Sequence, residues 1–157
     1  MTPNRFTAFL EEQKVPYEVL RHQKAYTAQE VAHAVHLSGK EVAKSVVVQA
    51  DGKYVLVVMP APHRVNLASL KHALNAKDVR LATEDEVRSL FPDCEIGAMP
   101  PFGNLYGLPV YVSRPLTEDQ EIAFNAGTHT EAVKISYKDF QRLVNPTVVD
   151  FSESVDR

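Results

Sequence analysis

Residues 44–59 read KSVVVQADGKYVLVVM, and this stretch decides the fold. Two valine-rich runs, 44–50 and 53–59, stand on either side of the dipeptide Asp51-Gly52. Valine favours β-strands, and Asp-Gly readily adopts the positive φ angles that a two-residue hairpin turn requires. The stretch therefore predicts two antiparallel strands joined by a tight turn.

Helix signals surround this hairpin. Thr27 and Thr83 each have a glutamate three residues later, which predicts a capping box, and Asn66 can cap the helix that follows it. Apolar residues recur at helical spacing over five segments, which predicts five helices. These segments are 6–10, 28–35, 67–74, 87–91 and 137–144.

Further strands complete the pattern. We expect them at 79–82, 109–113, 121–125 and 131–136, with a short extended segment over 15–20. Strands and hairpins mixed with helices do not form a regular βαβ repeat, so the order of elements predicts an α+β fold. We expect a barrel-like mixed β-sheet flanked by helices. Because no charge run or Gly/Ser tract divides the chain, residues 1–157 are expected to form a single domain.

The composition is that of an ordinary globular protein, with 45% hydrophobic and 24% charged residues. The single cysteine, Cys94, cannot form an internal disulfide, and the first residues lack a long apolar run. We therefore expect a reducing, cytoplasmic setting without a membrane partner. A formal net charge of −3 provides no global basic field for DNA or for non-specific RNA binding. A local basic edge can form from Lys40, Lys53, His63, Arg64, Lys71 and His72.

Lys44 stands at the start of the first strand of the hairpin. Alternation places its side chain on the face of Val46 and Val48, which we expect to be the core face, whereas Ser45 and Val47 point the other way. In one interpretation the lysine extends its ammonium group past apolar neighbours into water. In the other, the ammonium group lies at the rim of a pocket, where it binds an anionic or carbonyl oxygen or acts as a base.

Residues 97–104, GAMPPFGN, place two glycines and two prolines between predicted elements. Proline stiffens the backbone, and glycine lets a ligand approach it closely. Exposed backbone N–H groups in such a loop can stabilise the oxyanion that forms when an ester carbonyl is attacked. The alternative is an ordinary rigid connection.

Residues 125–129, NAGTH, lie at a turn between two predicted strands. There His129 is either presented to a cleft or solvated as a turn histidine. The hydroxyl groups of Thr128 and Thr130 can orient the imidazole or bind a substrate amine, although turn threonines commonly bond backbone groups.

Other common kinds of site are not supported by the sequence. His33 and His36 are only three residues apart, and there is no HExxH or paired CxxC spacing, so we expect no metal site. No P-loop or GxGxxG motif is present, and we expect no cofactor. Cys94 has no base partner near it in sequence, so a cysteine hydrolase is not expected.

Three segments in this order and spacing resemble the YbaK family of editing domains, which also occurs as the editing insertion of bacterial prolyl-tRNA synthetases. The segments are EVAKSVV at 41–47, GAMPP at 97–101 and NAGTH at 125–129. The resemblance extends from about Thr27 to Asn145. It implies a mixed, barrel-like sheet flanked by helices, and hydrolysis of an amino acid misattached to the 3′ end of a transfer RNA.

The resemblance also implies roles for individual residues. Lys44 would be the catalytic residue and would bind a phosphate or carbonyl oxygen, while water assisted by the substrate's own ribose hydroxyl attacks the ester. The partner would be the 3′ end of a mischarged tRNA, with an aminoacyl-tRNA synthetase or elongation factor binding transiently. The substrate-binding residues would be Gly97, Pro101, Gly103, Gly127, Thr128 and His129.

Two other functions stay open on the sequence. One is a catalytically silent module that holds a tRNA end or a synthetase, which predicts binding without ester cleavage. The other is a small-molecule hydrolase or amino-acid sensor that reuses the pocket, because a fold alone does not determine a function.

Overall fold

The structure is a computed structural model that describes residues 5–21 and 41–154. The predicted helix over 28–35, with its capping box at Thr27, lies outside the described residues. In sequence order the elements are α1 (Arg5–Glu12), β1 (Glu18–Arg21), β2 (Ala43–Ala50), β3 (Lys53–Pro60), β4 (His63–Val65), α3 (Leu67–Ala73), β5 (Val79–Leu81), α4 (Glu84–Leu90), η2 (Gly103–Tyr106), β6 (Val110–Ser113), η3 (Arg114–Glu118), β7 (Glu121–Asn125), β8 (Glu131–Ser136), α5 (Tyr137–Val144), β9 (Thr147–Val149) and β10 (Ser152–Ser154).

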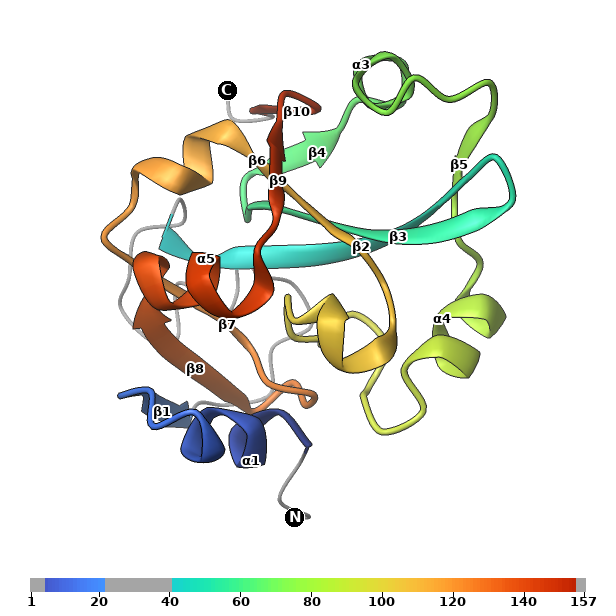
Figure 1. The fold of residues 1–157 in the computed structure, drawn as a ribbon. Helices are drawn as coiled ribbons and strands as arrows, with labels where there is room; N and C mark the ends of the chain where they lie inside the picture. Colours follow the sequence, from blue (N-terminus) through green and yellow to red (C-terminus); the bar gives the residue numbers. More distant parts are fainter. Residues whose placement is uncertain (1–4, 22–40, 155–157) are drawn as a thin grey trace.

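The predicted hairpin is confirmed and lies at the centre of the larger sheet (Figure 1). β2 and β3 pair antiparallel with Ala50 opposite Lys53. The turn residues Asp51 and Gly52 have φ angles of 50° and 83°, as the Asp-Gly dipeptide predicts. The Asp51 carboxylate also accepts backbone N–H bonds from Lys77 and Asp78, which connects the turn to the segment before β5.

The strands form a mixed arrangement, as expected. The five-stranded sheet has the order β5-β2-β3-β6-β9, and its β3–β6 and β6–β9 pairs are parallel. A three-stranded antiparallel sheet has the order β1-β8-β7, and β10 pairs with β4. Among residues 5–21 and 41–154, one isolated parallel bridge, between Val42 and Ala123, joins the two larger sheets. Within the described residues these sheets do not close into one continuous barrel.

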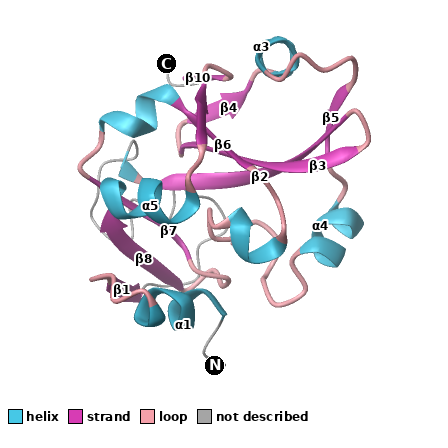
Figure 2. Cartoon of the chain, in the orientation of Figure 1, coloured by secondary structure: helices cyan, strands magenta, loops and turns pink. Residues whose placement is uncertain are grey.

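The helices lie around the strands (Figure 2). Two predicted caps are confirmed: the Asn66 side chain accepts from the backbone N–H of Ser69, and Thr83 forms a complete capping box with Glu86. No helix in the described part of the chain is long and apolar enough to cross a membrane. The 3₁₀ helix η2 begins at Gly103, inside residues 97–104, which were expected to form a loop.

Both faces of the β2–β3 hairpin are buried, which corrects the expectation that the Lys44 face is the main core face. Ala43 and Val47 point into the larger hydrophobic cluster. Val48 points into a smaller cluster with Leu70 of α3, because alternate residues of a strand face opposite sides. A valine-rich strand covered on both faces carries no alternating pattern from which sequence can choose the main core.

Candidate functional site

The loop before Met99 and the turn after Asn125 are joined by backbone hydrogen bonds. The Glu95 N–H donates to the Gly127 carbonyl over 2.8 Å, and the Gly127 N–H donates to the Ala98 carbonyl over 2.8 Å. The Glu95 carboxylate also accepts the His129 backbone N–H over 2.8 Å. Two of the segments that sequence analysis selected therefore form one unit, although about 30 residues separate them.

His129 lies inside this unit and is only 5% exposed, so it is not a solvated turn histidine. Its Nε2 atom lies 2.7 Å from the Ile96 carbonyl oxygen. Because a carbonyl only accepts, Nε2 must carry the proton and donate it. The imidazole therefore fastens the turn to the loop through Nε2, and that nitrogen is not available as a base.

The two glycines of the unit are needed for backbone reasons. Gly97 and Gly127 have φ angles of 85° and 101°, a region that side-chain-bearing residues rarely adopt. A Cβ atom on Gly97 would lie 3.5 Å from His129 Cε1, and one on Gly127 would lie 3.8 Å from Cys94 Sγ. Thr128 is half-buried, and its hydroxyl lies 3.4 Å from that of Thr130.

The far end of the loop is anchored in the core. The Phe102 ring packs against Phe6 of α1, Phe124 of β7 and Phe140 of α5, with centroid separations of 4.7, 5.9 and 5.7 Å. Pro101 is buried. A Cβ atom on Gly103 would lie 2.8 Å from the Leu108 carbonyl oxygen, so this glycine is required by close packing. These core contacts fix the position of the C-terminal end of residues 97–101.

Lys44 is half-buried, and burial lowers the pKa of its ammonium group. Neither an ion pair nor a hydrogen bond joins its ammonium group to any residue in the described ranges. The Val42–Ala123 bridge is parallel, so Lys44 and Asn125 follow two residues later on the two strands and come level with each other. The structure therefore brings the lysine to the strand that leads into the turn of His129.

Sequence analysis did not select Asn125 as a site residue. Asn125 is the buried polar residue that ends β7, directly before the turn of His129. It is 8% exposed, and its side-chain oxygen has no hydrogen-bond partner. Unpaired buried carboxamides are uncommon in folded proteins. The only sequence signal was its position at the start of the NAGTH segment.

Cys94 lies beside the same unit but is held by other groups. Its Sγ atom is 3.4 Å from the Tyr106 hydroxyl, which donates to the Asp93 carboxylate over 2.9 Å. Burial is the main cause that raises the pKa of Tyr106. These neighbours are a phenol and a carboxylate, neither of which is the imidazole that usually activates a cysteine nucleophile.

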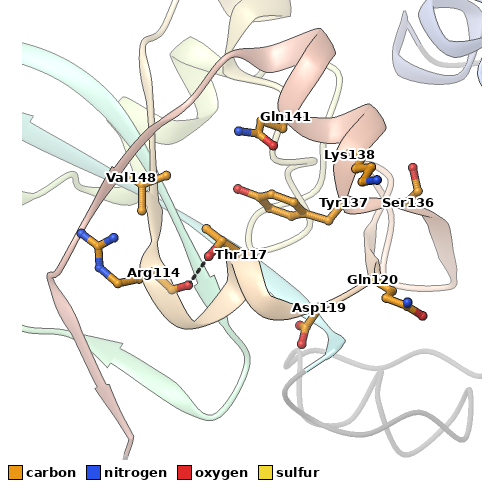
Figure 3. Close-up of a pocket in the computed structure, with 9 residues that line it drawn as sticks. All are labelled: Arg114, Thr117, Asp119, Gln120, Ser136, Tyr137, Lys138, Gln141 and Val148. Carbon is orange, nitrogen blue, oxygen red and sulfur yellow. Dashed lines mark hydrogen bonds between the residues drawn. The ribbon is translucent and has the colours of Figure 1, made fainter.

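A separate depression of about 630 Å³ lies at the other end of β7 and β8 (Figure 3). It lies between η3 and the start of α5, and Arg114, Lys138 and Tyr137 are among its lining residues. None of the predicted site residues lines it. Sequence analysis did not identify it, because the residues come from three separated segments without a shared motif.

The predicted basic edge is divided between paired and exposed residues. Arg64 forms an ion pair with Glu153 at 2.9 Å, and His63 Nδ1 lies 2.8 Å from the Ser152 hydroxyl. Lys53, Lys71 and His72 are exposed. Lys40 lies outside the described residues. In the described part of the chain, no group of three or more histidine, cysteine or acidic side chains is arranged to hold a metal ion.

The chain is similar to known tRNA-editing proteins and domains. The Escherichia coli K12 protein described as multifunctional Ser/Thr-tRNA deacylase ProXp-y is 28% identical over 157 residues, covering 96% of this chain and 93% of that protein. A proline–tRNA ligase of Halalkalibacterium halodurans is 36% identical over 77 residues, but the match covers 49% of this chain and only 13% of the ligase.

A solved crystal structure of a candidate trans-editing enzyme for prolyl tRNA synthetase superposes with a TM-score of 0.85 and 26% identity, covering 98% of this chain and 99% of that one. It supports the α+β assignment. The model of the aminoacyl-tRNA editing domain matches residues 22–143, which is most of the chain. The chain therefore belongs to the aminoacyl-tRNA editing domain family.

Proposed function

We propose that this protein hydrolyses the ester bond of mischarged tRNA as a trans-acting aminoacyl-tRNA deacylase, with residues 1–157 as one editing domain. The observation that carries the proposal is Lys44, a half-buried ammonium group without a partner among the described residues, level with the strand that enters the turn of His129. Leaving a buried cation unpaired costs stability, and such groups concentrate at functional sites. Membership of the editing family and the near-complete match to a tRNA deacylase support the same activity.

The chain offers two kinds of group for the reaction. The Lys44 ammonium group attracts a carbonyl or phosphate oxygen of the aminoacyl end. The backbone N–H groups of Gly97 and Met99 donate to no other described residue, and in this proposal they stabilise the oxyanion. Pro100 and Pro101 have no N–H group and stiffen the loop that carries these donors.

The attacking water is activated by the substrate's own ribose hydroxyl in this proposal. The described residues support that assignment indirectly, because His129 Nε2 is committed to the Ile96 carbonyl and Cys94 is held by Tyr106. An aminoacyl ester is labile, so positioning and oxyanion stabilisation supply enough of the rate enhancement.

The substrate class is a small or non-cognate amino acid on the 3′ end of a tRNA. A synthetase pocket that accepts a larger amino acid cannot strongly exclude a slightly smaller one, so a second hydrolytic site removes the resulting errors. A synthetase or elongation factor would bind only transiently. The E. coli relative acts on seryl- and threonyl-tRNA, which makes these two esters the first to test.

The test is release of amino acid from a panel of purified mischarged tRNAs at low salt, where a weak RNA contact still forms. Wild type is compared with Lys44→Ala and with the control Lys77→Ala, which removes an exposed lysine outside the predicted basic edge. We expect selective hydrolysis that Lys44→Ala abolishes and Lys77→Ala retains. Binding of tRNA without hydrolysis by wild type would favour the silent binding module instead.

A further inference from the structure

The strands β2 and β7 separate just where the proposed site begins. Val42 and Ala123 form a parallel bridge, but Lys44 and Asn125, two residues further on, do not continue it as a ladder. The pairing of the two strands therefore stops before the level of Lys44 and Asn125.

Both polar side chains lie on one face of these strands. Val42 and Ala123 belong to a small cluster that also contains Ala61 and Ala132. Residues two positions apart on a strand share a face, so Lys44 and Asn125 lie on the same side as this cluster. The two polar groups are the chemically distinct features of this otherwise apolar face.

Asn125 is a buried acceptor that the fold does not use. Its side-chain oxygen is inaccessible to water, lacks a hydrogen-bond partner, and is not satisfied by the nearby lysine. Leaving such a group unpaired costs about 1–3 kcal/mol. Folded proteins seldom keep a buried polar group unsatisfied, and a bound ligand is one way to supply the missing partner.

We propose that the Asn125 carboxamide oxygen binds the α-ammonium group of the aminoacyl ester, so that the site selects esters with a free amine. This inference rests on the proposed deacylase function and adds a substrate-recognition residue to it. An ammonium group offers three N–H donors, and a hydrogen bond to a charged group is stronger than a neutral one. With the amine held at Asn125, the adjacent ester carbonyl lies toward Lys44 and the Gly97–Pro101 loop.

Selection of a free amine distinguishes aminoacyl-tRNA from peptidyl-tRNA and other N-blocked esters. Blocking the amine removes its charge and two of its donors, and adds bulk beside the buried cluster of Val42 and Ala123. A site built around a buried acceptor discriminates strongly against a ligand that leaves the acceptor unpaired.

The test compares an aminoacyl-tRNA that wild type hydrolyses with the same tRNA after N-acetylation of the amino acid. We expect wild type to prefer the free amine by at least about tenfold in kcat/KM, the size of one hydrogen bond to a charged group. Asn125→Ala should lower kcat/KM for the free amine by a similar factor and leave the N-acetyl rate unchanged. Asn125→Asp, which keeps an acceptor oxygen, should retain the preference.

Thermal unfolding provides a control for structural damage. Because the oxygen has no partner in the fold, Asn125→Ala removes no hydrogen bond made by that oxygen, and its Tm should stay within a few degrees of wild type. Equal loss of both rates in Asn125→Ala, or loss of the preference in Asn125→Asp, would overturn the inference. So would a preference that Asn125→Ala leaves unchanged. Failure of wild type to hydrolyse either ester would instead refute the proposed function.

Discussion

Replacement of His129 by alanine tests whether this residue fastens the turn to the loop or acts in acid–base chemistry. The substitution removes the 2.7 Å hydrogen bond from Nε2 to the Ile96 carbonyl and empties a site in which the imidazole is 5% exposed. The lost bond contributes about 1 kcal/mol, and the Ile96 carbonyl left without this donor costs about 1–3 kcal/mol. We expect His129→Ala to lower the free energy of unfolding by about 3 kcal/mol.

The matched variant is His129→Gln, whose side-chain NH₂ group can donate from nearly the same position as Nε2. Urea unfolding gives the free energies, and a thermal scan should show a Tm loss of roughly 6–12 °C for His129→Ala, at 2–4 °C for each kcal/mol. Deacylation of the same ester is measured in parallel.

We expect His129→Ala to lose both stability and activity, because the Gly97 loop is no longer held against the turn. His129→Gln should recover most of both. If His129→Gln has wild-type stability but no activity, the imidazole itself takes part in the chemistry. If His129→Ala is as stable as wild type, the hydrogen bond to Ile96 does not hold the loop, and the reasoning fails.

The remaining predictions concern two glycines and the lysine. Gly103→Ala should reduce the free energy of unfolding by about 1–3 kcal/mol in urea titrations, because its Cβ would lie 2.8 Å from the Leu108 carbonyl oxygen and a buried backbone cannot easily move away. Gly97→Ala forces alanine into a left-handed conformation at a cost of about 1–2 kcal/mol. We expect kcat to fall, with less effect on stability than Gly103→Ala has. An unchanged kcat would contradict the proposed role of the Gly97–Pro101 loop in the reaction. Lys44→Met should unfold at higher urea than wild type at pH 7, because burial lowers the pKa of Lys44 and thus penalises its charged form in the folded state. The unfolded chain binds the Lys44 proton more tightly than the folded chain does. The stability of wild type relative to Lys44→Met should therefore rise as the pH rises through the lowered pKa toward the ordinary value of 10.5. If the difference in unfolding free energy between the two proteins is the same at pH 7 and pH 10, Lys44 is not desolvated.

Sequence patterns predicted the turns and helix caps correctly, because these features depend on residues close together in the chain. The Asp51-Gly52 turn, the Asn66 cap and the Thr83–Glu86 capping box all follow from interactions within a few residues. Such interactions are specified by side-chain chemistry at short range, so their sequence patterns identify them.

Side-chain orientation was harder to predict. Lys44 was expected to point toward the main core, but the larger cluster lies on the Ala43 and Val47 face. A continuous valine run is compatible with burial on either side, and the choice depends on which helices cover each face. The burial and hydrogen bonding of His129 could not be predicted from sequence either, because its partner Ile96 lies 33 residues away in the chain.

The sequence by itself determined the central hairpin, the α+β class, the helix caps and the three segments that identify the editing family. Only the tertiary structure decided that residues 95–98 join the turn of His129, that Lys44 comes level with Asn125, and that the Asn125 oxygen stays unpaired. The physical reason is range: turns and caps are made by neighbours in the chain, whereas these features arise from hydrogen bonds and strand register between segments that meet only when the two sheets pack together.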